Sequence, residues 1–183
     1  MDEERTGEKV RVCDVATEKE TTMFDRFGEM SSADEINTLA VNLRKEGDMD
    51  SIYVLAKENG IDKDVAEIFI AGDLLYLCDD MAAAIGKIDI EVAELKPVEI
   101  MADWVDYLKS KCFEDPEMAK AVRMKGKNLK GAIAALLTWS FKNQHPVDKD
   151  ILKAAGVTAG KCTLGIPGMG RAKKIMSDYY MGK

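Results

Sequence analysis

The strongest constraint on the fold of this chain is a helical spacing of apolar residues that begins again after each of several helix-capping residues. Apolar side chains recur three and four positions apart after Ser32, Asp115, Asn128 and Asp148, whose side chains can accept hydrogen bonds from a first helical turn. The 183 residues are 46% apolar, which suffices for one ordinary domain, or two small ones, with a hydrophobic core. We therefore expect an all-α protein with seven to nine helices and little or no sheet.

Three short helices with tight joints are expected first, and they form a compact acidic module. Ser32 and Glu35 have the capping-box spacing at the start of the first helix. Asp48 or Asp50 can cap the second helix, and Asp62 can begin the third.

Composition divides the chain into four segments. They are a flexible N-terminal arm at 1–30, an acidic helical module at 31–86, a linker at 87–97 and a basic helical module at 98–183. The acidic module ends in an apolar stretch, 74–85, that predicts a central, buried helix. The linker holds alternating apolar residues that can form an extended piece, and a short alternation of valines in the arm could instead form a lone strand.

The basic module repeats the helical pattern. An apolar stripe over residues 100–112 precedes Asp115-Pro116, a pair typical of a helix start. The helix after Asn128 is expected to turn an apolar side inward, with Trp139 towards a flank; the inward residues are Leu129, Ile133, Leu136, Leu137 and Phe141. A short helix follows Asp148, and a last helix runs from about Arg171 to Tyr180.

The net charge of −7 conceals two oppositely charged halves. Residues 1–96 contain 24 Asp or Glu and 11 Lys or Arg, whereas residues 97–183 contain 9 and 15. Such asymmetry favours binding of nucleic acid or of a charged partner, although the two halves could also attract each other within one fold.

No pattern for catalysis or for a cofactor stands out in the sequence. His145 has no carboxylate or thiol nearby at metal-ligand spacing, and the four cysteines fit neither a zinc site nor a dense disulfide scaffold. There is no phosphate-binding glycine-lysine loop and no nucleophilic serine elbow. We expect a protein that is not an enzyme, binds no metal or cofactor, and keeps Cys78 and Cys112 as reduced core residues.

The cell compartment is inferred from what the chain lacks. No apolar run approaches the roughly 18 residues needed to span a bilayer, and the first twenty residues are charged rather than signal-like. These features predict a soluble, cytoplasmic protein that does not engage a membrane.

Five basic residues are clustered near the middle of the basic module. They are Lys120, Arg123, Lys125, Lys127 and Lys130. No acidic residue occurs between Glu117 and Asp148, so this cluster could bind a phosphate backbone or an acidic protein surface. A solvated lysine face is the alternative.

A glycine-rich segment from 164 to 175 leads into the last helix. It resembles the turn of helix-hairpin-helix DNA-binding motifs, in which backbone amides at a helix N-terminus bind a phosphate. The basic residues Arg171, Lys173 and Lys174 follow the turn and are candidate contacts to nucleic acid or to another partner. An ordinary glycine-rich connection is the alternative.

Residues 100–180 contain several short stretches that resemble one known family. These stretches are Trp104-Val105-Asp106-Tyr107-Leu108-Lys109, Glu114-Asp115-Pro116-Glu117-Met118-Ala119-Lys120, Lys127-Asn128-Leu129-Lys130-Gly131-Ala132 and Tyr179-Tyr180. They resemble the PcfK-like proteins of conjugative elements, a family that includes inhibitors of type II CRISPR effector nucleases. The first half resembles proteins of prophages and mobile elements of gut Firmicutes, in Asp34-Glu35-Ile36-Asn37 and in Glu58-Asn59-Gly60-Ile61-Asp62.

The resemblance implies an anti-CRISPR protein in the cytoplasm of a bacterial host cell. Such a protein would bind the guide-loaded nuclease and block DNA binding or cleavage. Asp48, Asp50, Asp62 and Asp64 are candidate contacts in the acidic half, which could compete for a positively charged DNA channel while the basic half contacts guide RNA. Two alternatives stay open: a nucleic-acid-binding accessory or regulatory protein of a phage or conjugative element, and an assembly factor that binds protein only.

Overall fold

The computed structural model describes residues 24–158 and 160–183, and within these ranges the protein is mainly helical. Nine helices are present there: α1 (Ala33–Glu46), α2 (Met49–Glu58), α3 (Lys63–Ala71), α4 (Asp80–Leu95), α5 (Ile100–Glu114), α6 (Pro116–Arg123), α7 (Leu129–Lys142), α8 (Lys149–Ala154) and α9 (Met169–Met181). Two short antiparallel strands, β1 (His145–Pro146) and β2 (Thr163–Leu164), form the sheet of the described part. The expected all-α class is confirmed.

The helix starts follow the capping residues of the sequence. Side-chain oxygens of Ser32, Asp48, Asp115, Asn128 and Asp148 accept hydrogen bonds from N–H groups of the first turns of α1, α2, α6, α7 and α8. In α7, for example, Gly131 N–H donates to Asn128 at 2.7 Å. Asp62 stands before α3 as expected, but its side chain makes no capping bond.

The expected helix at 74–85 and linker at 87–97 are wrong, because a single helix occupies the second half of the first segment and most of the second. Residues 72–79 form a loop, and α4 runs from Asp80 to Leu95. Asp79 caps α4 by accepting a hydrogen bond from Ala82 N–H at 2.7 Å, which sets the start of the helix later than the apolar pattern suggested. The alternation in the expected linker instead reflects a helix that buries Ile88 on one side.

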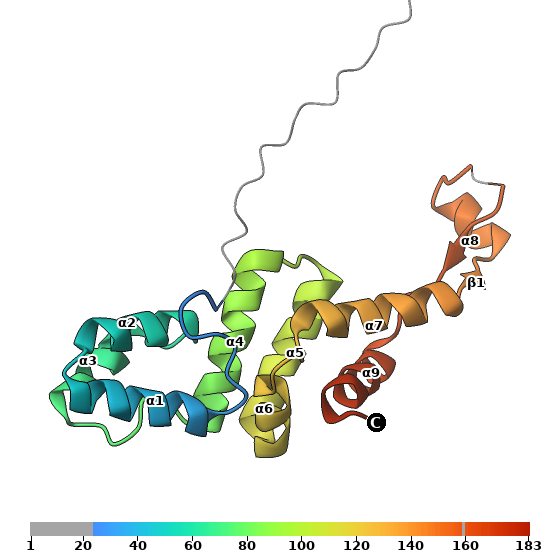
Figure 1. Ribbon diagram of the computed structural model, residues 1–183. Coiled ribbons are helices and arrows are strands. Elements are labelled where there is room, and N and C mark those ends of the chain that lie inside the picture. Colours follow the sequence, from blue (N-terminus) through green and yellow to red (C-terminus); the bar gives the residue numbers. More distant parts are fainter. Residues whose placement is uncertain (1–23, 159) are drawn as a thin grey trace, which may run out of the picture.

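Two groups of buried residues form the core, and α4 contributes to both. The first contains residues of α1 to α3 and Ala83 of α4. The second contains Ala84 and Ile88 of α4, together with residues of α5, α6, α7 and α9. Neighbouring positions of one helix therefore join the two groups, and Figure 1 shows α4 between α1–α3 and the helices of the second group.

Most of the expected arm at 1–30 lies outside the described residues, but its last seven residues pack on the folded body. Met30 is buried and Phe27 packs against the first group of core residues. Arg26 N–H donates to a carboxylate oxygen of Glu58 at 2.7 Å. The boundary of the folded part therefore precedes residue 30.

The end of α7 projects away from the rest of the protein, with β1 and α8 beyond it (Figure 1). None of the residues of α8 is buried. Leu137 and Phe141 of α7, which were expected to face inward, are exposed, and Phe141 is 76% exposed. The prediction was wrong for these two residues because the core that covers Leu129 and Leu136 does not reach this end of the helix.

No helix in the part of the chain that the structure describes is long and apolar enough to cross a membrane.

Candidate binding surfaces

Arg123 of the expected basic cluster does not belong to the protein surface. Its side chain is 1% exposed, and the guanidinium donates a hydrogen bond to Asn59 Oδ1 at 2.5 Å. Burial lowers the pKa of Arg123 from its ordinary value. Because Asn59 follows the last residue of α2, Arg123 connects the end of α6 to the end of α2 rather than meeting a partner.

Two further members of the basic cluster are engaged within the protein. Lys127 Nζ donates to the backbone oxygen of Tyr179 at 2.6 Å and lies 4.9 Å from the centroid of the Tyr179 ring. Lys120 is exposed and pairs with Glu117 at 3.1 Å, an exposed contact of the kind that costs little to break. Lys125 and Lys130 are the members that the structure leaves exposed without an ion pair described for them.

The backbone at the centre of this cluster also has a partner. Gly126 adopts a positive φ of 78°, which explains the glycine, and its N–H donates to Glu29 at 3.2 Å. This amide is therefore already bound within the chain. The cluster that the sequence suggested is reduced to the exposed lysines 120, 125 and 130.

The glycine-rich segment before the last helix is a connection between β2 and α9. Residues 165–168 lie between Leu164 of β2 and Met169, the first residue of α9. The turn thus follows a strand, and the first helix of a helix-hairpin-helix motif does not precede it. Gly168 stands at the N-cap of α9, where no side chain caps the helix.

Arg171, Lys173 and Lys174 are all exposed near the start of α9. The guanidinium carbon of Arg171 lies 6.0 Å from the ring centroid of Trp139, and Lys173 Nζ lies 4.9 Å from that of Tyr107. Lys174 pairs with Asp178 at 2.7 Å. The basic cluster contacts α9 at Tyr179 near its other end, so the two expected basic sites occupy different ends of this helix.

The four acidic candidates are divided between the two ends of α2. Asp48 and Asp50 lie at its start, where Asp48 accepts hydrogen bonds from Ser51, and these bonds lower the pKa of Asp48. Asp62 and Asp64 lie beyond its other end, at the start of α3. Asp50, Asp62 and Asp64 are exposed, so three of the four are free to meet a partner at their carboxylates.

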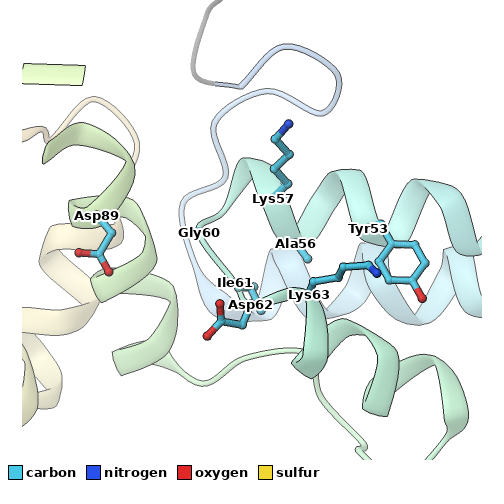
Figure 2. A pocket seen from close by; sticks show the side chains of 8 residues that line it. All are labelled: Tyr53, Ala56, Lys57, Gly60, Ile61, Asp62, Lys63 and Asp89. Carbon is cyan, nitrogen blue, oxygen red and sulfur yellow. The ribbon is translucent and has the colours of Figure 1, made fainter. Parts of the chain in front are cut away.

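Asp62 also borders a hollow of about 530 Å³ between α2, the start of α3 and α4 (Figure 2). The lining residues are Tyr53, Ala56, Lys57, Gly60, Ile61, Asp62, Lys63 and Asp89. Lys63 reaches toward Tyr53, its Nζ 5.7 Å from the ring centroid, and pairs with Glu67 at 3.0 Å. Asp89 pairs with Lys109 at 2.5 Å. Because these charges are mixed and partly paired, the hollow shows no preference for one sign of ligand.

Two buried charged residues of α4 were missed by the sequence reading because their segment was interpreted as a linker. Lys87 Nζ donates to Glu29 at 2.6 Å and to the backbone oxygen of Met124 at 3.0 Å. Glu91 accepts a hydrogen bond from Leu129 N–H at 2.6 Å, and its burial raises its pKa to about 7. The helical spacing of Ala84, Ile88 and Leu95 was the available signal that this segment is a helix.

The remaining candidates for chemistry are spread over the molecule. His145 is exposed in β1, and Cys78 and Cys112 are buried and free, as expected. Burial raises the pKa of both thiols to about 12, so neither is a reactive thiolate near neutral pH. Among residues 24–158 and 160–183, no three His, Cys, Asp or Glu side chains gather in a way that could hold a metal ion.

The charge division of the sequence persists on the folded surface. Residues 33–80 hold twelve Asp or Glu and four Lys or Arg, and none of the twelve carboxylate side chains is buried. Residues 124–183 hold eleven Lys or Arg and three Asp or Glu, and none of the eleven is buried. In Figure 1 these segments, α1–α3 and α7–α9, lie at opposite sides of α4 to α6. The protein therefore presents an acidic end and a basic end.

Comparison of the chain with models of known protein families, with curated proteins and with solved structures finds no match. The family resemblance thus depends on the short stretches quoted above.

Proposed function

We propose that this protein is a non-catalytic inhibitor that binds a guide-loaded type II CRISPR effector nuclease and blocks DNA binding or cleavage. The observation that carries the proposal is the acidic end formed by residues 33–80, whose carboxylates all lie outside the core. Nucleases of this class hold nucleic acid in positively charged channels, so an acidic surface can compete for such a channel. The resemblance to PcfK-like proteins supplies the identity of the partner.

The burial of Arg123 and the internal contacts of Lys127 weaken the case for phosphate-backbone binding by the basic cluster. They remove two of five cations from the surface expected to bind a phosphate backbone, whereas three of the four acidic candidates stay exposed. The acidic end is therefore the better candidate for the main partner contact, and the basic end is a secondary contact to guide RNA or to an acidic protein surface.

The test is to mix the full chain with a guide-loaded type II effector nuclease and to measure both complex formation and DNA cleavage. We expect a complex and loss of cleavage near stoichiometric amounts. A variant with Asp50→Asn, Asp62→Asn and Asp64→Asn should bind more weakly, by roughly fivefold or more, because exposed charge contacts are worth up to about 1 kcal/mol each. Asp48 stays unchanged because its carboxylate caps α2.

A matched control removes the same number of negative charges from the other half. Asp103→Asn, Asp106→Asn and Glu114→Gln neutralise exposed residues of α5 and should leave the affinity unchanged. Circular dichroism must show that both variants stay folded, since acidic residues in a first helical turn contribute about 0.3–1 kcal/mol. Equal weakening by both variants would show that net charge, rather than the acidic end, determines binding.

The role of the basic end is tested by reversing the two exposed lysines, with Lys125→Glu and Lys130→Glu. Weakened binding is expected if the basic end contacts guide RNA, and unchanged binding assigns the contact to the acidic end alone. Arg123 and Lys127 are left intact because their side chains bond within the protein.

The second candidate is a nucleic-acid-binding accessory or regulatory protein of a phage or conjugative element. It is favoured by the exposure of Arg171, Lys173 and Lys174 at the start of α9, where the N-terminal amides have no side-chain cap. Retention of plain duplex DNA at moderate salt, with no binding or slowing of any tested nuclease, would replace the inhibitor proposal with this one.

A further inference from the structure

The projecting end of the protein carries a concentration of exposed apolar side chains. Of the fifteen large apolar residues that are exposed in the described chain, seven lie between residues 137 and 169. Phe141 is 76% exposed and Ile151 62% exposed, and α8 buries none of its residues. Grouped apolar exposure of this kind is uncommon on a surface that has no partner.

The same segment is basic. We define the distal surface as Phe141, Ile151, Leu164 and Ile166 together with the lysines 142, 149, 153 and 161, all of which are exposed. The pairing of β1 with β2 holds part of this surface together, because it brings Leu164 opposite His145, four residues after Phe141. A partner for the distal surface should therefore offer apolar groups surrounded by carboxylates.

The opposite end of the same chain offers such a surface in the loop between α3 and α4. We define the loop surface as residues 72–79 and the hollow beside them. Leu75 and Tyr76 are exposed there, at 75% and 67%. Tyr76 borders a hollow of about 350 Å³, whose lining residues are Ala33, Asp34, Asn37, Tyr76, Cys78, Asp79 and Asp80. Three of these seven residues are acidic, and none is basic.

We propose that the protein associates head to tail, with the distal surface of one copy docked on the loop surface of a second copy. Each surface combines exposed apolar groups with a net charge, and the two net charges are opposite. In the distal segment the four lysines outnumber the exposed Asp148 and Asp150, whereas the hollow of the loop surface is lined by acidic residues and no basic one. The loop surface belongs to the α1–α3 side of the molecule and α8 to the other side in Figure 1, so one chain does not bring its own two surfaces together. Docking of a second copy covers the distal surface of one chain and the loop surface of the other.

Head-to-tail contact has a consequence for the size of the assembly. The interface is heterologous, since different surfaces of the two copies meet, and each added copy leaves one surface of each kind open. Dimers, trimers and larger species should therefore appear in sequence as the concentration rises. The lysines are exposed and none of the carboxylates is buried, so added salt should weaken the association.

Sedimentation velocity of the full chain over a range of concentrations tests the proposal, and no nuclease is present in the experiment. We expect the weight-average sedimentation coefficient to rise with concentration and to rise less at high salt. A chain that stays monomeric throughout, or an association that salt leaves unchanged, would overturn the proposal.

Two variants identify the surfaces. Ile151→Asp with Leu164→Asp alters the distal surface, and Leu75→Asp with Tyr76→Asp alters the loop surface. Each variant alone should lose the concentration dependence, whereas an equal mixture should form a heterodimer and nothing larger, because each variant retains one intact surface. A mixture that stays monomeric, or a single variant that still associates, would contradict the head-to-tail arrangement.

The matched control changes exposed apolar residues that lie outside both surfaces. Val98→Asp and Phe113→Asp introduce the same charges at positions that are 61% and 62% exposed. This control should associate as the unchanged chain does, and its loss of association would show that added negative charge alone prevents it. Unfolding midpoints of all variants should match that of the unchanged chain, because each substituted side chain is exposed.

Discussion

Buried ionisable side chains gather where the two groups of core residues meet, and Glu91 is one whose carboxylate is only partly hydrogen-bonded. Its Oε2 accepts from Leu129 N–H, but its other carboxylate oxygen has no hydrogen-bond partner among the described residues. Burial raises the pKa to about 7 from an ordinary value of 4.5, although the nearby charges of Lys87 and Arg123 act in the opposite direction. The folded protein therefore keeps a proton on Glu91 over a pH range in which the unfolded chain has released it.

The stability of the protein should depend on pH through the titration of the Glu91 carboxyl. The pKa of Glu91 is higher in the folded protein than in the unfolded chain. The contribution of Glu91 to the free energy of unfolding is therefore fully present below about pH 4.5 and is lost as the pH rises through about 7. Glu91→Gln removes the charge and keeps an acceptor for Leu129 N–H. In urea unfolding, we expect the variant to gain on the order of 2 kcal/mol relative to the unchanged chain between pH 5 and pH 8.

The control for this prediction is Glu94→Gln, which changes an exposed carboxylate of the same helix. Its effect should stay within about 0.5 kcal/mol at both pH values. If Glu91→Gln shifts stability equally at pH 5 and pH 8, the carboxyl titrates near its ordinary value and the burial argument is wrong.

At the scale of elements, the joint between α2 and α4 depends on glycine. Gly86 lies within α4, and an added Cβ there would overlap the backbone oxygen of Asn59 just beyond α2. Alanine is favoured over glycine in a helix by about 1 kcal/mol. However, neither side of this contact is a movable side chain, and overpacking costs about 1–3 kcal/mol. The steric overlap between α4 and the end of α2 should therefore decide whether Gly86→Ala stabilises or destabilises the protein.

We expect Gly86→Ala to lower the free energy of unfolding by about 1–2 kcal/mol, since overpacking outweighs helix propensity. Gly170→Ala is the matched control because Gly170 is also helical and has no atom within 4 Å of an added Cβ. That substitution should raise the free energy of unfolding by up to about 1 kcal/mol. Chemical denaturation of both variants measures the difference, and a stabilising Gly86→Ala would mean that α2 and α4 are not in close contact.

For the whole molecule, the sharing of α4 by both groups of core residues predicts cooperative unfolding. Trp104 and Trp139 are the two tryptophans of the chain, and both lie in the second half. Phe69 is fully buried in the first group, so Phe69→Ala should cost about 3–5 kcal/mol. If the molecule unfolds as one unit, tryptophan fluorescence and far-ultraviolet circular dichroism should both shift to the same lower urea midpoint. An unchanged fluorescence midpoint would show that the acidic and basic modules unfold separately.

The sequence by itself determined the helical class and most helix starts. A cap is a contact between a side chain and a backbone amide two or three residues later, as for Ser32 with Glu35 and Asn128 with Gly131. Such contacts need no other part of the fold, so they can be identified from neighbouring residues. The acidic and basic halves are likewise a property of composition, and the folded surface retains them.

Only the tertiary structure decided which of these residues are available to a partner. Arg123 is buried against Asn59, which lies 64 positions away, and Lys127 bonds to Tyr179, 52 positions away. Phe141 has the helical spacing of a core residue but is exposed, because neither group of core residues extends to the end of α7. Burial depends on which distant segments meet, and a local pattern holds no information about that contact.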